Sequence, residues 1–167
     1  MKAIQNLKIL PIAKEHAEGF HRCLDSVARE RLYLALVQAP TFDSTRQFVL
    51  SNIANDVPQF VAMIDNEVVG WCDILPVKRE GFTHCGELGM GVHPRYRRLG
   101  IGQQLIVRTI QKAKEKGLER IELEVFASNV PAIKLYEKLG FVTEGVKKKA
   151  RKIDGRYDDI VEMALFI

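Results

Sequence analysis

The residues that most clearly indicate a chemical role form a basic, glycine-containing turn between an expected strand and an expected helix. The turn reads Arg97-Arg98-Leu99-Gly100-Ile101-Gly102-Gln103. The first N–H groups of a helix have no intrahelical partners, and the positive end of the helix dipole lies there. Gly100 and Gly102 carry no Cβ, so an anion can approach the backbone, and the arginines add positive charge. This combination predicts a phosphate-binding site.

Two common phosphate-binding patterns do not fit this turn. The Walker pattern fails because no Gly-Lys-Ser/Thr closes the turn. The dinucleotide pattern Gly-x-Gly-x-x-Gly fails because its third glycine would fall at Leu105. What remains is Arg-x-x-Gly-x-Gly after a strand, from Arg97 to Gly102.

This pattern resembles the coenzyme A pyrophosphate loop of the GNAT family of N-acetyltransferases, and Val92-x-Pro94 before it is also similar. A second block, Leu123–Phe141, resembles the family's strand, Asn-x-x-Ala helix and Leu-Tyr-x-x-x-Gly-Phe ending. The tail Asp154–Asp159 resembles the closing hairpin of the ribosomal-protein alanine acetyltransferase branch and its small-amine relatives. The resemblance is sharp over about residues 87–167 and weakens to element order before them.

The resemblance implies a cofactor site for acetyl-CoA as cosubstrate. The backbone of the expected strand would pair with the pantetheine arm, the turn would hold the pyrophosphate with Arg97 flanking it, and a side-chain amide would contact the cofactor. The alternatives are an ordinary buried strand and, for Asn129, a helix N-cap, for which Ser128 competes. The implied cofactor-binding residues are Met90, Gly91, Val92, Arg97, Arg98, Leu99, Gly100, Ile101, Gly102, Gln103 and Asn129.

The same resemblance implies two catalytic residues, Tyr136 as general acid and Glu124 as general base. A thiol pKa near ~8.5 and a phenol pKa near ~10 make proton transfer to the leaving thiolate feasible where the thiolate is poorly solvated. Tyr136 could instead be a core aromatic residue. The base could instead be Glu122, Glu87 or a water chain. Glu124 could also have only a structural role in a salt bridge.

The resemblance therefore implies direct transfer of an acetyl group to a primary amine of a small molecule or a protein N-terminus. The acceptor cleft would lie between the first helices, near Arg29–Tyr33, and the last hairpin, near Tyr157 and Asp158. Glu30 could receive an ammonium group there and Arg29 or Arg31 a carboxylate, and the alternative is that these residues form surface ion pairs. The alternative function is a non-catalytic acyl-CoA-binding sensor or partner module. The family frequently forms dimers, so a homodimer is open.

Other charged and metal-binding residue types give weaker signals. The basic run Lys147–Lys152 alternates between the faces of an expected strand, which favours a solvated hairpin over one patch. His93 fits a turn, and no Cys/His pair has zinc spacing, so we expect no metal. Without a stacking platform or a reading helix, we expect no nucleic-acid partner.

The periodicity of hydrophobic residues predicts the strands and helices that position these residues. Strand patterns and helix patterns alternate along much of the chain. This predicts an α/β domain with a mixed, mostly antiparallel sheet flanked by helices, in the order βααβββαβαββ. Asp43 or Ser44 is the expected cap of the second helix. The expected elements are residues 7–11, 14–37, 43–57, 59–64, 67–75, 87–93, 100–116, 120–126 and 129–139, then two strands within 141–167.

Length and composition fit one acetyltransferase domain over residues 1–167. The chain is 47% hydrophobic and 28% charged with a net charge of +4, which excludes disorder and a polybasic tail. No apolar run approaches the ~18 residues that span a bilayer, and we expect no membrane association. No secretory signal is visible in residues 1–8, and three widely spaced cysteines suit a reducing compartment, so we expect the cytoplasm.

Overall fold

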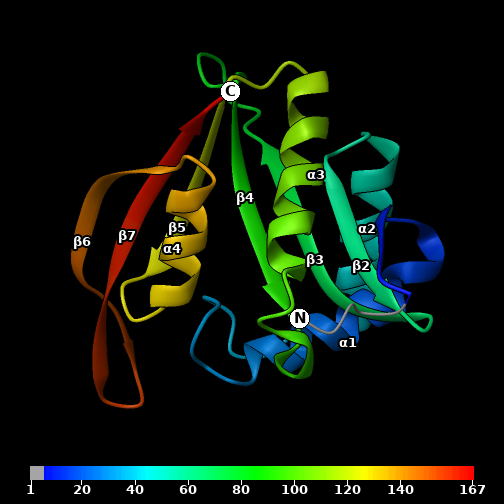
Figure 1. The fold of residues 1–167 in the computed structure, drawn as a ribbon, viewed down its shortest axis with the longest axis horizontal. Coiled ribbons are helices and arrows are strands. Elements are labelled where there is room, and N and C mark those ends of the chain that lie inside the picture. The colour runs from blue at the N-terminus through cyan, green and yellow to red at the C-terminus, as the bar shows by residue number, and fades with distance from the viewer. Residues whose placement is uncertain (1–5) are drawn as a thin grey trace.

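The computed structural model describes residues 6–167. Most of residues 1–8, for which we expect no secretory signal, therefore lies outside the described part of the chain. A seven-stranded sheet has the order β1-β2-β3-β4-β5-β7-β6 (Figure 1). Only β4 and β5 pair in parallel; the other neighbours are antiparallel. The strands are β1 Lys8–Pro11, β2 Gln59–Ile64, β3 Glu67–Pro76, β4 Cys85–Val92, β5 Arg120–Phe126, β6 Val142–Ile153 and β7 Arg156–Phe166.

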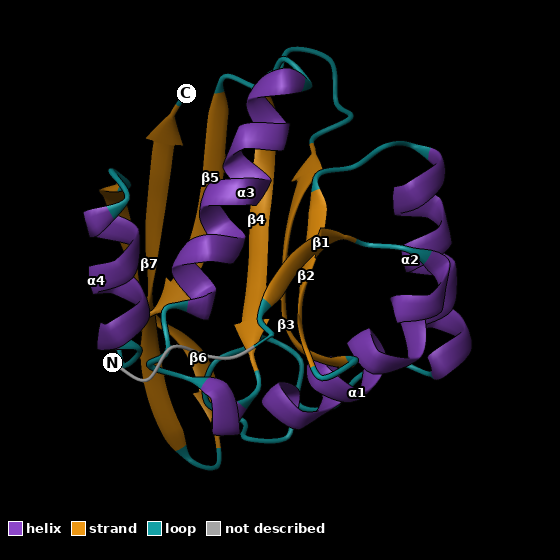
Figure 2. Ribbon diagram, turned by 45° about the vertical axis from the view of Figure 1, so that its right-hand side comes forward, coloured by secondary structure: helices purple, strands orange, loops and turns teal. Residues whose placement is uncertain are grey.

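Four α-helices cover the two faces of this sheet (Figure 2). One core cluster joins the sheet to α3 and α4, and a second joins its other face to α1 and α2. The predicted fold class and element order are confirmed, with short 3₁₀ helices added. The helices are η1 Lys14–His16, α1 Ala17–Ala28, α2 Phe42–Ala54, η2 Pro94–Tyr96, α3 Ile101–Glu115 and α4 Val130–Lys138. Among the described residues, no helix combines the length and apolar character needed to cross a membrane.

The first expected helix, which we extended to Val37, is wrong beyond Ala28. Residues 29–41 form a loop, named here the α1–α2 loop, in which Arg31 has a φ of 60°. Long-range partners hold this loop: Arg31 pairs with Asp154 at 2.8 Å. Helical periodicity could not reveal partners so distant in the sequence.

The expected cap of α2 is also wrong by a few residues. Thr41 is the N-cap, and its side chain accepts a hydrogen bond from the backbone N–H of Ser44 at 3.3 Å. Asp43 and Ser44 lie within the first turn instead. Several candidate cap residues in a row make this boundary ambiguous from sequence.

Candidate active site

The sheet splits between β4 and β5, and this split creates the main cleft. Pairing of β4 with β5 covers only Cys85–Glu87 against Arg120–Glu122, whereas pairing of β4 with β3 continues to Val92. Residues 88–92 of β4 therefore present backbone groups to a gap rather than to β5. Unpaired strand edges accept extended ligands by backbone hydrogen bonding.

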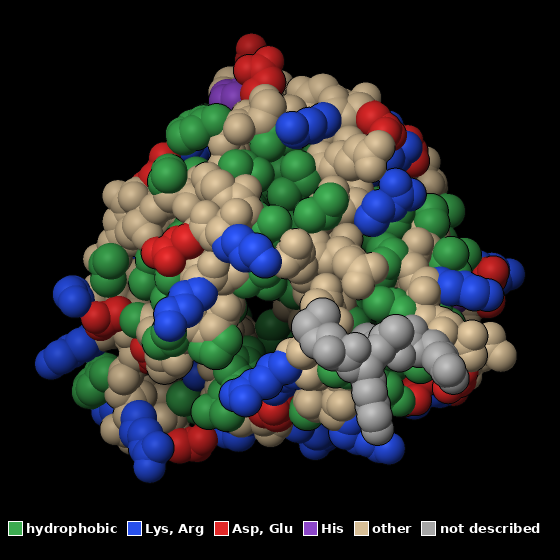
Figure 3. All heavy atoms as spheres, in the orientation of Figure 1, with side chains coloured by type: hydrophobic (Ala, Val, Ile, Leu, Met, Phe, Trp, Pro, Cys, Tyr) green, Lys and Arg blue, Asp and Glu red, His purple; other side chains and the backbone are tan. Residues whose placement is uncertain are grey.

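The cleft has a volume of about 1230 Å³ and extends from this gap to the start of α3. A hollow is visible between α3 and α4, with Lys and Arg side chains at its rim (Figure 3). Nearly all predicted site residues line the cleft, including Met90, Gly102, Asn129, Tyr136 and Glu124. Leu99 is the exception among them and is 38% exposed at the turn.

The turn before α3 has the geometry that the glycine pattern predicts. Gly100 is the N-cap of α3 with a φ of 76°, a left-handed conformation that favours glycine. A Cβ at Gly100 would have no atom within 4 Å, so the approach to the backbone is open. No acidic residue lies in the first turn of α3, which leaves its N–H groups and positive dipole end available to an anion.

The open backbone and free N–H groups of this turn therefore suit a phosphate-bearing ligand. Its two arginines differ in role. Arg98, with a φ of 61°, is exposed at the turn. Arg97 donates from Nε to the carbonyl oxygen of Val92 at 2.9 Å and pairs with Glu30 at 2.5 Å. Its guanidinium also lies over the ring of Tyr33 at 4.7 Å. Arg97 therefore ties the α1–α2 loop to the end of β4, and direct phosphate contact by Arg97 stays a prediction.

Packing against Trp71 requires a glycine at position 91, which the sequence alone did not reveal. A Cβ on Gly91 would lie 2.2 Å from Cη2 of Trp71 in β3. Trp71 is 4% exposed and packs edge-on against Phe20 of α1, so the ring cannot move aside easily. The backbone of Gly91 thus remains available to the cleft while the tryptophan fills the space of its side chain.

Tyr136 combines a position in the cleft with deep burial. It lies in α4, is 7% exposed, and its ring is 5.7 Å from that of Phe141. Burial, and secondarily the nearby Cys72 thiol, raises the pKa of Tyr136 well above its ordinary value. The phenol is therefore protonated at neutral pH and can donate a proton or hydrogen bond.

The two readings of Asn129 coexist in the structure. Its side-chain oxygen accepts from the N–H of Ala132 at 3.4 Å and caps α4. The same residue lines the cleft, so its NH₂ group remains for a ligand. Ser128 does not compete for the cap, because it binds the carboxylate of Asp158.

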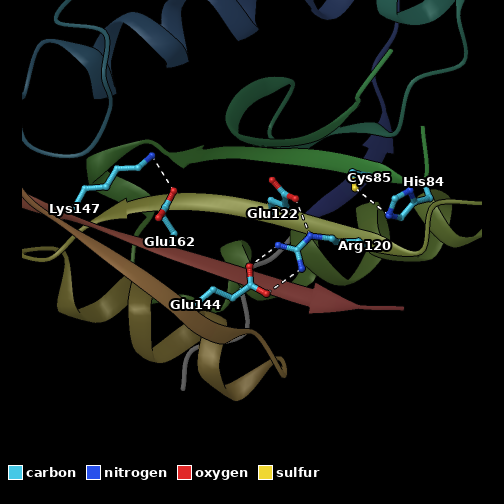
Figure 4. Close-up of polar contacts among 7 residues, drawn as sticks. All are labelled: His84, Cys85, Arg120, Glu122, Glu144, Lys147 and Glu162. Carbon is cyan, nitrogen blue, oxygen red and sulfur yellow. Dashed lines mark hydrogen bonds and ion pairs between the residues drawn. The ribbon is translucent and has the colours of Figure 1, made fainter. Parts of the chain in front are cut away.

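The candidate bases lie on the face of the sheet opposite α3 and α4. Leu123 and Val125 belong to the core under those helices, so alternation places Glu122 and Glu124 on the other face. Glu124 pairs with Lys147 at 2.5 Å, and Lys147 also contacts Glu162 at 2.8 Å (Figure 4).

Glu122 and Glu87 occupy different surroundings on this same face. Arg120 lies between Glu122, at 2.7 Å, and Glu144 (Figure 4). Glu87 lines the cleft without an ion pair to any described residue. The structure therefore gathers all three predicted carboxylates in one region without selecting a base.

Sequence reasoning missed one buried ionisable residue beside the cleft, Asp73 in β3. It is 6% exposed, and burial raises its pKa to about 7. The available signal was an aspartate inside the apolar run Trp71–Leu75. Among residues 6–167, no group of three or more His, Cys, Asp or Glu side chains is arranged to hold a metal ion.

A split sheet with a glycine turn at the start of the following helix defines the class of fold, and comparison identifies the family. The model described as "Acetyltransferase (GNAT) family" matches residues 20–141. This protein therefore belongs to the GNAT acetyltransferase family.

Curated relatives share the family but are matched over part of their length. The chain is 38% identical over 109 residues to an L-amino acid N-acetyltransferase of Escherichia coli, covering 65% of this chain and 67% of the relative. It is 42% identical over 93 residues to an N-alpha-acetyltransferase of Sulfurisphaera tokodaii, covering 49% and 54%. A ribosomal protein bS18-alanine N-acetyltransferase of E. coli is 40% identical over 77 residues, covering 46% and 51%. The matches thus span about half to two thirds of these relatives.

Solved structures reproduce the fold over nearly the whole chain. A GNAT-family acetyltransferase from Streptococcus pneumoniae has a TM-score of 0.90 at 25% identity, covering 97% of this chain and 100% of that one. A structure from Salmonella typhimurium, described with its cofactor acetyl-CoA, has a TM-score of 0.90 at 19% identity, covering 96% and 93%. The fold is thus that of GNAT acetyltransferases.

Proposed function

We propose that this protein transfers the acetyl group of acetyl-CoA to a primary amine. The observation that carries the proposal is the split between β4 and β5 with the start of α3 at its mouth. The family uses acetyl-CoA as donor, and the named relatives are N-acetyltransferases. Residues 90–92 would align the pantetheine arm along β4, and the turn of Arg98–Gln103 would hold the pyrophosphate.

Acetyl-CoA supplies an activated thioester carbonyl, at which a neutral amine forms the new C–N bond as the C–S bond breaks. The cleft contributes most through positioning, because it holds donor and acceptor together. Backbone N–H groups at the unpaired part of β4 would polarise the carbonyl oxygen. Tyr136 would give its proton to the departing sulfur, whose own pKa rises in a poorly solvated cleft.

The proton of the amine would leave on the opposite face of the sheet, where the carboxylates lie. Glu124 is the proposed base, with Glu122, Glu87 and a water chain as the alternatives. In the structure, Lys147 competes with an incoming amine for the carboxylate of Glu124. The unpaired Glu87 avoids that competition.

A thiol-release assay with acetyl-CoA and a panel of amines and N-terminal peptides tests the proposed function. We expect release of coenzyme A that depends on both the amine and the protein. Calorimetric titration with coenzyme A is the companion measurement. Tight binding without transfer to any amine would indicate the non-catalytic sensor instead, and absence of both would contradict the assignment of the cleft.

A further inference from the structure

Asp73 is a buried carboxylate that no described residue neutralises. Trp71, two residues earlier in β3, packs in the core formed by α1 and α2, so alternation places Asp73 on that same face. Neither a hydrogen bond nor an ion pair joins Asp73 to residues 6–167. Gln59 lies directly opposite in β2, yet its buried Nε2 also has no partner. Buried polar groups normally have partners, so these two need an explanation.

The carboxylate of Asp73 is directed across Gly89 of β4. A Cβ on Gly89 would lie 3.2 Å from Oδ1 of Asp73, in the register where the two residues pair. Gly89 itself lines the cleft, in the part of β4 that has separated from β5. Because glycine has no side chain, nothing on β4 at this position separates Asp73 from the acceptor side of the cleft.

Glu87 is the second unpaired carboxylate in this region. It lies on the same face of β4 as Gly89, two residues away, and pairs in register with Leu75. It is therefore a diagonal neighbour of Asp73, with Cα atoms roughly 7–8 Å apart in such a geometry. An ammonium group placed between the two would face negative charge from both strands.

The cations on this side of the cleft are already engaged. Arg120 lies between Glu122 and Glu144 (Figure 4). Lys147 pairs with both Glu124 and Glu162. This leaves little positive charge for a carboxylate of the acceptor.

Arg151 is another cation on this side, and it is held by the α1–α2 loop. It donates to the carbonyl oxygens of Arg31, at 2.9 Å, and Leu34, at 3.4 Å. Its guanidinium also stacks over Phe126 at 4.3 Å. Among the described residues, this side of the cleft therefore combines two unpaired carboxylates with three cations, Arg120, Lys147 and Arg151, that already have partners.

We infer that Asp73, together with Glu87, binds the ammonium group of the acceptor, and that this site selects amines without a carboxylate beside the amine. The inference rests on the proposed function and adds the acceptor class to it. An ammonium group would satisfy both unpaired carboxylates. The carboxylate of a free amino acid would instead be repelled in a poorly solvated site, which costs binding.

Matched acceptors test the selectivity. L-alanine and L-alaninamide differ in the charged carboxylate but share the side chain and the primary amine. Because the amine of alaninamide is less basic than that of alanine, turnover would differ even without selectivity. The two acceptors are therefore compared by calorimetry with the coenzyme A-loaded protein at a pH at which both amines are protonated, and we expect alaninamide to bind roughly tenfold or more tightly. Equal affinity for the pair, or preference for alanine, would overturn the selectivity.

The Asp73→Asn variant tests the ammonium site itself, with Asp56→Asn as control. Asp56 is an exposed aspartate that pairs with Lys112 and Lys116 away from the cleft. We expect Asp73→Asn to raise KM for alaninamide roughly tenfold or more, with KM for acetyl-CoA unchanged, and the control to change neither. An unchanged acceptor KM in folded Asp73→Asn would refute the role of Asp73.

A binding measurement separates this inference from the proposed function. Calorimetry of alaninamide with the coenzyme A-loaded protein compares wild type and Asp73→Asn without requiring turnover. Weaker binding to the variant supports the ammonium site even where acetyl transfer is not detected, and equal binding overturns it. Failure of transfer with all amines would then count against the proposed function alone.

Discussion

Tyr136 illustrates how one buried side chain can serve both packing and chemistry. Its ring packs on Phe141, and its hydroxyl lies in a cleft where burial keeps the phenol protonated. Removing only the hydroxyl separates the two roles, because phenylalanine preserves the ring.

We expect Tyr136→Phe to lower kcat roughly a hundredfold, the range typical of losing a general acid, while KM for acetyl-CoA changes little. Steady-state thiol release across pH provides the measurement, and thermal unfolding of the variant shows whether the core is intact. A variant with the turnover and pH profile of wild type would remove Tyr136 from the reaction.

Asp73 has an energetic cost that its proposed role explains. Its pKa in the folded protein is about 7 against an ordinary 3.8, so the folded state holds a proton that the unfolded state releases between these values. This contribution to stability is fully present below pH 3.8 and is lost as the pH rises through about 7. Its titratable neighbours are Glu87 on the same face and the Cys72 thiol beside it.

Asp73→Asn should therefore stabilise the protein at pH 8, by roughly 1–4 kcal/mol, and have little effect at pH 4. Thermal unfolding of wild type and variant at pH 4, 6 and 8 measures this difference. A gain in Tm that is the same at each pH would show that the charge of Asp73 is not its cause. A variant that is more stable but binds the acceptor less well is the pattern expected of a functional residue.

At the scale of elements, the turn and α3 act together, and Gly100 is the residue where they meet. Gly117 provides a matched position at the other end of α3: its φ of 79° is similar to the 76° of Gly100, and a Cβ there also meets nothing within 4 Å. The two sites thus differ mainly in their distance from the cleft.

We expect Gly100→Asp to weaken coenzyme A binding roughly a hundredfold or more, because a carboxylate at the start of α3 would repel the pyrophosphate. Gly117→Asp should leave binding unchanged, although each variant loses about 1–2 kcal/mol from the left-handed backbone. Calorimetry with coenzyme A makes the comparison. Equal effects of the two substitutions would mean that general destabilisation, rather than the turn, controls affinity.

The elements also show where prediction from sequence succeeds. The bounds of β2 and β5 agree with the prediction, because each is a compact run of apolar and β-branched residues between turns. The α1–α2 loop was missed because its structure depends on Arg97 and Asp154, remote in sequence. Asp73 was missed because one aspartate in an apolar strand does not reveal which face it occupies or what lies across from it.

At the scale of the molecule, the sheet consists of two parts joined by a short strand pairing. Within the sheet, the part containing β1–β4 pairs with the part containing β5, β7 and β6 only through residues 85–87 and 120–122, although one core cluster spans both parts. The sequence motifs predicted the strands, but not that β4 and β5 would separate after this short contact.

We therefore expect coenzyme A to slow hydrogen exchange at backbone amides of residues 88–92, with smaller effects in β1 and β2. A ligand that pairs with the exposed part of β4 would protect these amides and bridge the two parts. Exchange with and without coenzyme A, read by mass spectrometry, tests this. Protection confined to the start of α3 would restrict the contact to the pyrophosphate.

The α1–α2 loop has a consequence for substrate access. Through Glu30 it is bound to Arg97 beside the donor turn, and through Arg31 it is bound to the β6–β7 hairpin. Because Tyr33, Leu34 and Ala35 of this loop line the cleft, we expect its length and anchors to limit the size of the acceptor. We therefore expect that exchanging the α1–α2 loop between related enzymes changes which acceptors bind, while the affinity for coenzyme A stays the same.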